Sequence, residues 1–286
     1  MAAFPFIAIE VGLAQNIFAR HDLQIESVAL GGDAKVQQAL TADAADIGLG
    51  SGPALAFLAK GAPVLGVAAL ANAPSMLALV VLDSGPVKSI ADLKGRTIAV
   101  TSTGSLTEWF VDEISRQQGW GRDGIRIAAL GDLPSELAAL RTGQIDGISG
   151  DILAGLRSGQ ETPAHVLLAY DALVKDFHVQ IIYATLSSLK QDPQAVRRFL
   201  AAWFETVAFM RDHKDAVVQI GAPLIALDEP TFARLYDAVM PVMSRDGRFN
   251  PKALAVLAQS FVDLQQLPAA PDMGKLVTEA YLPAGK

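Results

Sequence analysis

The sequence predicts an α/β protein built from two similar lobes. The chain has 286 residues, 51% of them hydrophobic, which is enough to bury more than one core. Residues 11–70 and 111–170 align without a gap at an offset of 100, with 12 identities in 60 positions. Both copies show strands and helices in the same order. Such alternation is typical of mostly parallel sheets that are flanked by helices and joined by right-handed crossovers.

The second copy shows this order most clearly, because a polar loop at residues 101–105 separates its first strand from its first helix. Pro134 opens the next helix and Gly143 ends it. The strands are expected at residues 96–100, 124–130, 145–149 and 166–170, and the helices at 106–118 and 133–141.

The first copy lacks a counterpart for one strand. The loop at residues 101–105 corresponds to residues 1–5, so the strand before that loop would precede Met1. We expect the natural protein or its precursor to carry this strand, because the loss of an inner strand leaves backbone groups of its neighbours unpaired. The helices of this copy are expected at residues 6–20 and 34–41, and its strands at 23–29, 45–49 and 65–70.

From residue 189 onward the pattern changes to helices. They are predicted at residues 194–213, 231–243 and 252–265, and each has a proline at or near its first position. Aromatic and aliphatic side chains recur in them at helical spacing, which we interpret as a core face and not as a ligand-binding box.

Two apolar runs, residues 76–82 and 179–185, are expected to lead from the first lobe to the second and back, and so to form a hinge. The uncharged stretch at residues 61–82 has the length of a membrane span. However, the turn signal at residues 72–75 divides it into two short apolar runs. We therefore expect two buried strands there.

Composition and motifs exclude several classes of function. With 23 basic and 30 acidic residues the formal charge is −7, and no basic run is present to bind phosphates, so no nucleic-acid partner is expected. Cysteine is absent, which excludes disulfides, cysteine-ligated metals and thiol nucleophiles. Residues 1–10 show no signal-peptide pattern. The four histidines lack metal-site spacing, so no catalytic residue, metal or cofactor is predicted.

Ligands of open α/β sheets bind beyond the carboxyl ends of the strands, where loops converge. Loops with hydroxyl groups and free N–H groups follow predicted strands in both lobes, and we expect them to face one cleft and contact a ligand. The residues concerned are Ser51 and Gly52 in one lobe, and Ser102, Thr103, Gly104, Ser105 and Asp151 in the other.

The charge of the ligand stays open at this point. These loops contain no Lys or Arg, so an anionic ligand would depend on backbone donors, whereas a cationic or heterocyclic ligand would contact Asp151. Phe4 and Trp109 would supply apolar walls, although a core role is equally consistent with their positions.

Several segments, in this order, resemble the nitrate/sulfonate/taurine class of solute-binding proteins of ABC transporters, which is related to the thiamine-pyrimidine synthases. The resemblance covers nearly the whole chain and includes the capped C-terminal helices. Its segments are residues 8–18, 23–26, 38–53, 60–64, 89–100 and 139–147.

The resemblance implies a type II periplasmic-binding fold, with lobe one at residues 1–79 and 184–286 and lobe two at 80–183. It also implies an exported periplasmic or lipid-tethered monomer that closes on a small molecule and delivers it to an ABC permease. The ligand loops of the family correspond to Phe4, to Ser51 and Gly52, to residues 102–105 and to the stretch around Asn72.

Two alternatives remain within the same fold. One is an enzyme related to the thiamine-pyrimidine synthases, although the cysteine-rich motif of that branch is missing here. The other is a ligand-sensing domain. An enzyme would consume its ligand, whereas a binding protein would release it unchanged.

Overall fold

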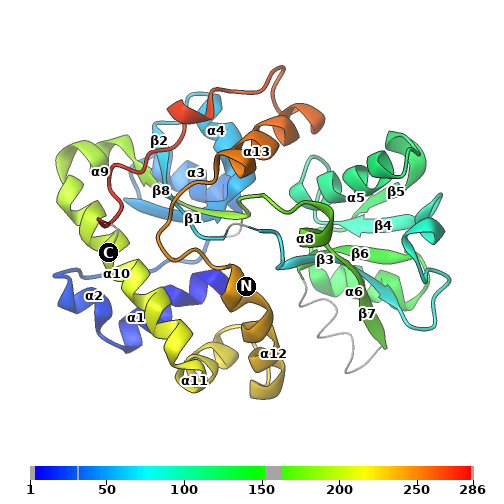
Figure 1. Ribbon diagram of the computed structural model, residues 1–286, viewed down its shortest axis with the longest axis horizontal. Coiled ribbons are helices and arrows are strands. Elements are labelled where there is room, and N and C mark those ends of the chain that lie inside the picture. The colour runs from blue at the N-terminus through cyan, green and yellow to red at the C-terminus, as the bar shows by residue number, and fades with distance from the viewer. Residues whose placement is uncertain (1–3, 31, 72, 152–162, 285–286) are drawn as a thin grey trace. The chain divides into compact units, whose positions relative to one another are not determined.

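Two separate sheets, each flanked by helices, organise the computed structural model (Figure 1). The residues that the structure describes are 4–30, 32–71, 73–151 and 163–284. Unit 1 comprises residues 1–73, 176–259 and 269–286, and unit 2 comprises residues 74–175 and 260–268. The predicted α/β class with two lobes is confirmed, while the lobe boundaries expected after residues 79 and 183 stay a prediction.

Unit 1 is built on a three-stranded sheet in the order β1-β8-β2. The strands are β1 (Ile47–Ser51), β8 (Gln180–Thr185) and β2 (Val64–Ala69). Both outer strands run antiparallel to β8, so the expectation of a mostly parallel sheet is wrong for this unit. The reason is the course of the chain. Residues 179–185, which were expected to lead back from the second lobe, form β8 and lie between β1 and β2.

The predicted helical stripe of unit 1 is core, as expected. Trp203 is fully buried, and Phe199 stacks on Phe18 with ring centroids 5.8 Å apart. Asp192 and Asp228 cap helices α10 and α12 by accepting hydrogen bonds from backbone N–H groups. The helices are η1 (Phe4–Ile7), α1 (Ala8–Ala14), α2 (Ile17–Arg20), α3 (Asp33–Thr41), η2 (Gly52–Ala54), α4 (Leu55–Ala59), α9 (Leu186–Gln191), α10 (Pro193–Asp212), α11 (Lys214–Leu224), α12 (Glu229–Val239), η5 (Met240–Val242) and η6 (Met273–Lys275). Helix α13 (Pro251–Asp263) begins in unit 1 and ends in unit 2.

Residues 23–30 form no strand, which corrects the prediction of one at residues 23–29. A strand needs a hydrogen-bonded neighbour. The corresponding strand of unit 2, β5 (Arg126–Ala129), pairs with β4 (Thr97–Val100), whereas β1 pairs only with β8 among the described residues. Val28 and Leu30 are accordingly 68% and 41% exposed. The upstream strand itself stays a prediction.

Unit 2 contains a five-stranded mixed sheet in the order β5-β4-β6-β3-β7. Strand β4 is parallel to β5 and β6, as predicted from the repeat, whereas β3 runs antiparallel to β6 and β7. The strands are β3 (Leu77–Leu82), β4 (Thr97–Val100), β5 (Arg126–Ala129), β6 (Gly147–Asp151) and β7 (Ala164–Ala169). The helices are η3 (Ile90–Leu93), α5 (Leu106–Gln117), η4 (Arg122–Gly124), α6 (Leu133–Arg141) and α8 (Tyr170–Leu173).

The stretch at residues 61–82 contains β2 and β3, and none of its described residues lies in a helix. Within the described ranges, no helix has the length and apolar character that crossing a bilayer requires.

Candidate functional site

The loop at residues 101–105 connects the end of β4 to the start of α5, as the sequence predicts. Ser105 is the N-cap of α5, and its hydroxyl accepts a hydrogen bond from the backbone N–H of Glu108. Gly104 has a φ of +77°, a left-handed conformation that glycine adopts without strain. Ser102 and Thr103 are exposed, so their hydroxyls are accessible to a ligand.

Neighbouring side chains already occupy several donors of this loop. The N–H of Gly104 donates to the Glu108 carboxylate at 2.5 Å, and the N–H of Thr101 donates to the Thr107 hydroxyl at 3.0 Å. The Gln266 amide donates to the Gly104 carbonyl at 2.8 Å. The hydroxyls of Ser102 and Thr103 are therefore more accessible to a ligand than these N–H groups.

Acidic groups on α5 surround the base of this loop. Burial raises the pKa of Asp112 to about 6, although the charge of Arg122 opposes that shift. Arg122 also lies 4.0 Å from Glu108 and 3.7 Å from Asp112, so one guanidinium neutralises part of both carboxylates. This compensation limits the repulsion that an anionic ligand would meet.

Two aromatic side chains fix α5 against the sheet of unit 2. Tyr170 stacks on Phe110 with ring centroids 4.2 Å apart, and its hydroxyl donates to Ser149 at 2.5 Å. Ser149 in turn donates to the Thr107 carbonyl at 2.8 Å. Burial raises the pKa of Tyr170, so it remains a neutral donor. Asp151, a predicted ligand contact, is half-buried at the end of β6, opposite Leu77 of β3.

Ser51 lies at the end of β1, where an acid from α3 holds it. Its backbone N–H and its hydroxyl donate to the Asp33 carboxylate at 2.8 and 2.5 Å. The Tyr183 hydroxyl donates to the Ser51 carbonyl at 2.6 Å. Burial, together with the charge of Asp33, raises the pKa of Tyr183 well above its ordinary value. Because the hydroxyl proton of Ser51 is committed to Asp33, its oxygen is placed to accept a hydrogen bond from a ligand.

Gly52 is required by packing. A Cβ atom at this position would lie 1.9 Å from the backbone carbonyl oxygen of His178. The Gly52 N–H donates to the Val179 carbonyl at 2.8 Å, which holds the two segments together. Sequence reasoning assigned Gly52 to a ligand loop, and the structure adds this close approach.

His178 is a fully buried side chain that joins three segments of unit 1. Its Nε2 accepts a hydrogen bond from the Asn250 N–H at 2.9 Å, so the ring hydrogen is on Nδ1, which lies 3.4 Å from the Ala71 carbonyl. Burial lowers the pKa of His178, although Asp176 nearby opposes the shift. The Phe249 ring packs edge-on to the imidazole at 5.5 Å.

Both predicted aromatic walls are buried. Phe4 is 2% exposed and packs on Phe232 and Tyr236 of α12 at 5.5 and 6.2 Å. Trp109 is 4% exposed, and its indole N–H donates to Asp263 at 3.1 Å. These placements favour the core role over ligand contact. Asn72 lies outside the described residues.

The structure shows a cationic side chain, Arg245, that the prediction of ligand-binding loops did not include. Arg245 lines a hollow of unit 1 together with Ala73 and other residues of the segment 241–246. The sequence offered no signal for it, because Arg245 follows no predicted strand and is far along the chain from the other loops.

A family model described as NMT1/THI5 like matches residues 4–217 of the chain. The chain belongs to the NMT1/THI5-like family. No curated protein sequence matches it significantly. This membership agrees with the resemblance that the sequence segments indicated.

Solved structures of solute-binding proteins share the fold. The periplasmic aliphatic sulphonate-binding protein SsuA from Escherichia coli has a TM-score of 0.85 and 20% identity, over 98% of this chain and 91% of that one. The alkanesulfonate-binding protein SsuA from Xanthomonas axonopodis pv. citri, bound to MOPS, has a TM-score of 0.79 and 16% identity, over 95% of this chain and 94% of that one.

An enzyme also shares the fold. The desulfurization enzyme DszB, in complex with biphenyl-2-sulfinic acid, has a TM-score of 0.71 and 14% identity, over 96% of this chain and 94% of that one. That structure is of a mutant in which serine replaces a cysteine. The NMT1/THI5-like chain described here contains no cysteine.

Proposed function

We propose that this protein is the solute-binding component of an ABC importer and that its ligand is a small organic oxyanion of the sulfonate class. It works in the periplasm, closes on the ligand between its two units, and passes the ligand to a membrane permease. The loop at residues 101–105 carries the proposal, because its exposed hydroxyls lie at the carboxyl end of β4, where ligands of such sheets bind.

Three further observations support the proposal. The fold is that of sulfonate-binding proteins. Arg122 partly neutralises the acids below the loop. The absence of cysteine removes the thiol nucleophile that an enzyme of this fold could use, which favours binding over catalysis.

Thermal unfolding in the presence of candidate ligands tests the function. The panel contains hexanesulfonate, taurine, MOPS and nitrate, with hexanol and hexylamine as uncharged and cationic controls. At a ligand concentration 100 times the Kd, binding stabilises the folded state by about 2.7 kcal/mol, which gives a clear rise in Tm. A panel in which only the uncharged or cationic compounds raise Tm would overturn the assigned ligand class. Mass spectrometry should recover the bound compound unchanged, and its conversion would favour an enzyme.

The double variant Ser51→Ala with Thr103→Ala tests the two loops. Each lost hydrogen bond weakens binding by about 0.5 to 1.5 kcal/mol, so the loss of two should raise the Kd for the best sulfonate about 5- to 150-fold. Isothermal titration calorimetry measures this change. The matched control is Ser27→Ala with Ser135→Ala, which removes one exposed hydroxyl from each unit outside the loops. Equal affinity in both double variants would show that these hydroxyls do not contact the ligand.

A further inference from the structure

Unit 1 carries a hollow of about 370 Å³ that is lined by Ala73 and by residues 241–246. The lining includes Arg245, which is exposed, and Ser244, which is buried. Neither residue belongs to the loops that the sequence singled out.

Backbone pairing places this hollow at the same edge of the sheet as Ser51. Ser51 lies opposite Gln180, and the Gln180 carbonyl accepts a hydrogen bond from the Leu70 N–H at 2.9 Å. The Leu70 carbonyl then accepts one from the Ser244 N–H at 2.7 Å. A bridge between Ala71 and Met243 continues this pairing. The ends of β1, β8 and β2 and the segment before Arg245 therefore lie side by side.

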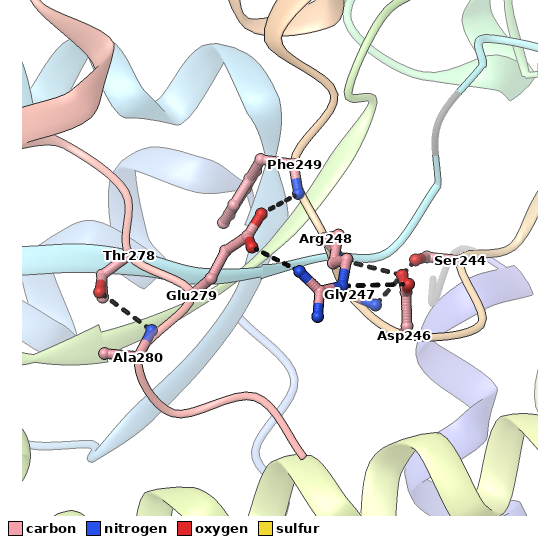
Figure 2. Close-up of polar contacts among 8 residues, drawn as sticks. All are labelled: Ser244, Asp246, Gly247, Arg248, Phe249, Thr278, Glu279 and Ala280. Carbon is pink, nitrogen blue, oxygen red and sulfur yellow. Dashed lines mark hydrogen bonds and ion pairs between the residues drawn. The ribbon is translucent and has the colours of Figure 1, made fainter. Parts of the chain in front are cut away.

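The lining of the hollow contains one cation, Arg245, and one acid, Asp246. The carboxylate of Asp246 lies 3.5 Å from the Arg248 side chain and accepts a hydrogen bond from the Arg248 N–H at 3.1 Å. Arg248 also lies 3.4 Å from Glu279, and Figure 2 shows this chain of contacts. Arg245 is exposed and forms no ion pair with any residue that the structure describes. Arg245 is therefore available to pair with an anionic group of a ligand.

A second guanidinium contacts the same segment of the chain. Arg211 of α10 donates to the carbonyl of Met243, two residues before Arg245, while its buried Nε has no hydrogen-bond partner among the described residues. Burial, followed by the charge of Arg245, lowers the pKa of Arg211, so the two cations repel each other. An anion bound to Arg245 would relieve this repulsion.

Ser244, the residue before Arg245 in the lining, carries a neutral hydroxyl group. Its oxygen accepts a hydrogen bond from the Gly247 N–H at 2.9 Å (Figure 2), and this leaves its own hydrogen available to donate. A planar guanidinium with a hydroxyl donor beside it matches the several oxygens of a sulfonate group.

We propose that Arg245 and Ser244 bind the sulfonate head of the ligand and that Arg245 determines the preference for an anion. The inference rests on the proposed function and adds the group that recognises the charge. Ser102 and Thr103 of unit 2 would then contact other polar atoms of the ligand.

The experiment compares Arg245→Gln, Arg245→Lys and the control Arg234→Gln with the wild-type protein. Arg234 is an exposed arginine of unit 1 whose side chain donates a hydrogen bond to Thr231 of its own helix, so its variant makes the same change in net charge outside the hollow. Calorimetry measures the Kd for hexanesulfonate and for hexanol, and circular dichroism checks that each variant is folded.

Loss of charged hydrogen bonds should raise the Kd for hexanesulfonate about 10- to 100-fold in Arg245→Gln, with a smaller rise in Arg245→Lys. The control Arg234→Gln should stay within about twofold of wild type, because an exposed charge outside the site contributes little. The preference for hexanesulfonate over hexanol should disappear in Arg245→Gln alone.

Two negative outcomes of this experiment have different meanings. If hexanesulfonate binds the wild type and Arg245→Gln equally well, the inference is overturned while the proposed function stands. If no sulfonate binds the wild type, the proposed ligand class fails and the inference fails with it.

Discussion

Gly52 shows how a single position serves packing at the edge of a candidate site. A Cβ atom in place of its α-hydrogen would lie 1.9 Å from the His178 carbonyl oxygen. The carbonyl oxygen belongs to the backbone and Cβ is fixed to Cα, so the two segments cannot move apart without breaking the Gly52 to Val179 hydrogen bond. A side chain is excluded here for a steric reason, independent of any ligand.

Gly52→Ala should therefore destabilise the protein by about 1 to 3 kcal/mol or more, the usual cost of overpacking. Urea unfolding followed by circular dichroism measures the change in the midpoint. Gly150→Ala is the matched control, because its Cβ would meet nothing nearer than a side-chain atom at 3.6 Å. Equal midpoints for the two variants would contradict the close approach at Gly52.

At the scale of elements, His178 connects the segments by which the chain leaves and re-enters unit 1. Ala71 precedes the passage to unit 2 after residue 73, His178 follows the return after residue 175, and Asn250 starts the approach to α13. The imidazole must be neutral to accept the Asn250 hydrogen bond. Protonation would therefore break the connection.

This arrangement predicts a dependence of stability on pH. The pKa of His178 is lowered in the folded state. Below the unfolded-state pKa of about 6.5 the unfolded chain binds more protons, so the contribution of His178 is complete above that pH and is lost as pH falls. Urea unfolding between about pH 7.5 and 5 should show this loss in the wild type.

The variant His178→Gln isolates this effect, because an uncharged amide can accept from Asn250 and donate to Ala71 without titrating. Subtracting the stability–pH curve of His178→Gln from that of the wild type also removes the contributions of Asp112 and Glu136. Burial raises the pKa values of these two groups to about 6 and about 7. A wild-type curve parallel to that of His178→Gln would show that His178 does not titrate in this range.

At the scale of the whole molecule, the chain passes between the units after residues 73, 175, 259 and 268. The proposed closure predicts that a bound sulfonate reduces the radius of gyration in small-angle X-ray scattering toward about 19 Å, the value for a compact chain of this length. The Ser51→Ala with Thr103→Ala variant at the same ligand concentration should remain closer to the unliganded value. An unchanged radius on saturation with ligand would argue against closure.

The sequence predicted those elements whose signals are local. The α5 loop follows from Thr, Ser and Gly between a strand and a capped helix, and the cap at Asp192 forms as its Asp-Pro pattern indicates. The strands β4 and β6 and the core stripe of α10 depend on periodicity alone, and periodicity is visible in the chain.

Pairing between distant segments was not predictable in the same way. The strand predicted at residues 23–29 has the right alternation but no described neighbour to complete its hydrogen bonds. The run at residues 179–185 reads as a connection, yet it becomes β8 at the centre of a sheet. Phe4 and Trp109 could equally have been walls or core until packing buried them.

The sequence by itself therefore determined the α/β class, the order of elements in the second copy of the repeat, the polar loops after the strands and the absence of thiol chemistry. Only the tertiary structure decided that Asp33 holds Ser51, that His178 joins three segments, and that Arg245 lies at the same sheet edge as Ser51. The physical reason is that local periodicity and capping act over a few residues, whereas these contacts depend on which distant backbones pair, a choice made by the burial and hydrogen bonding of the whole unit.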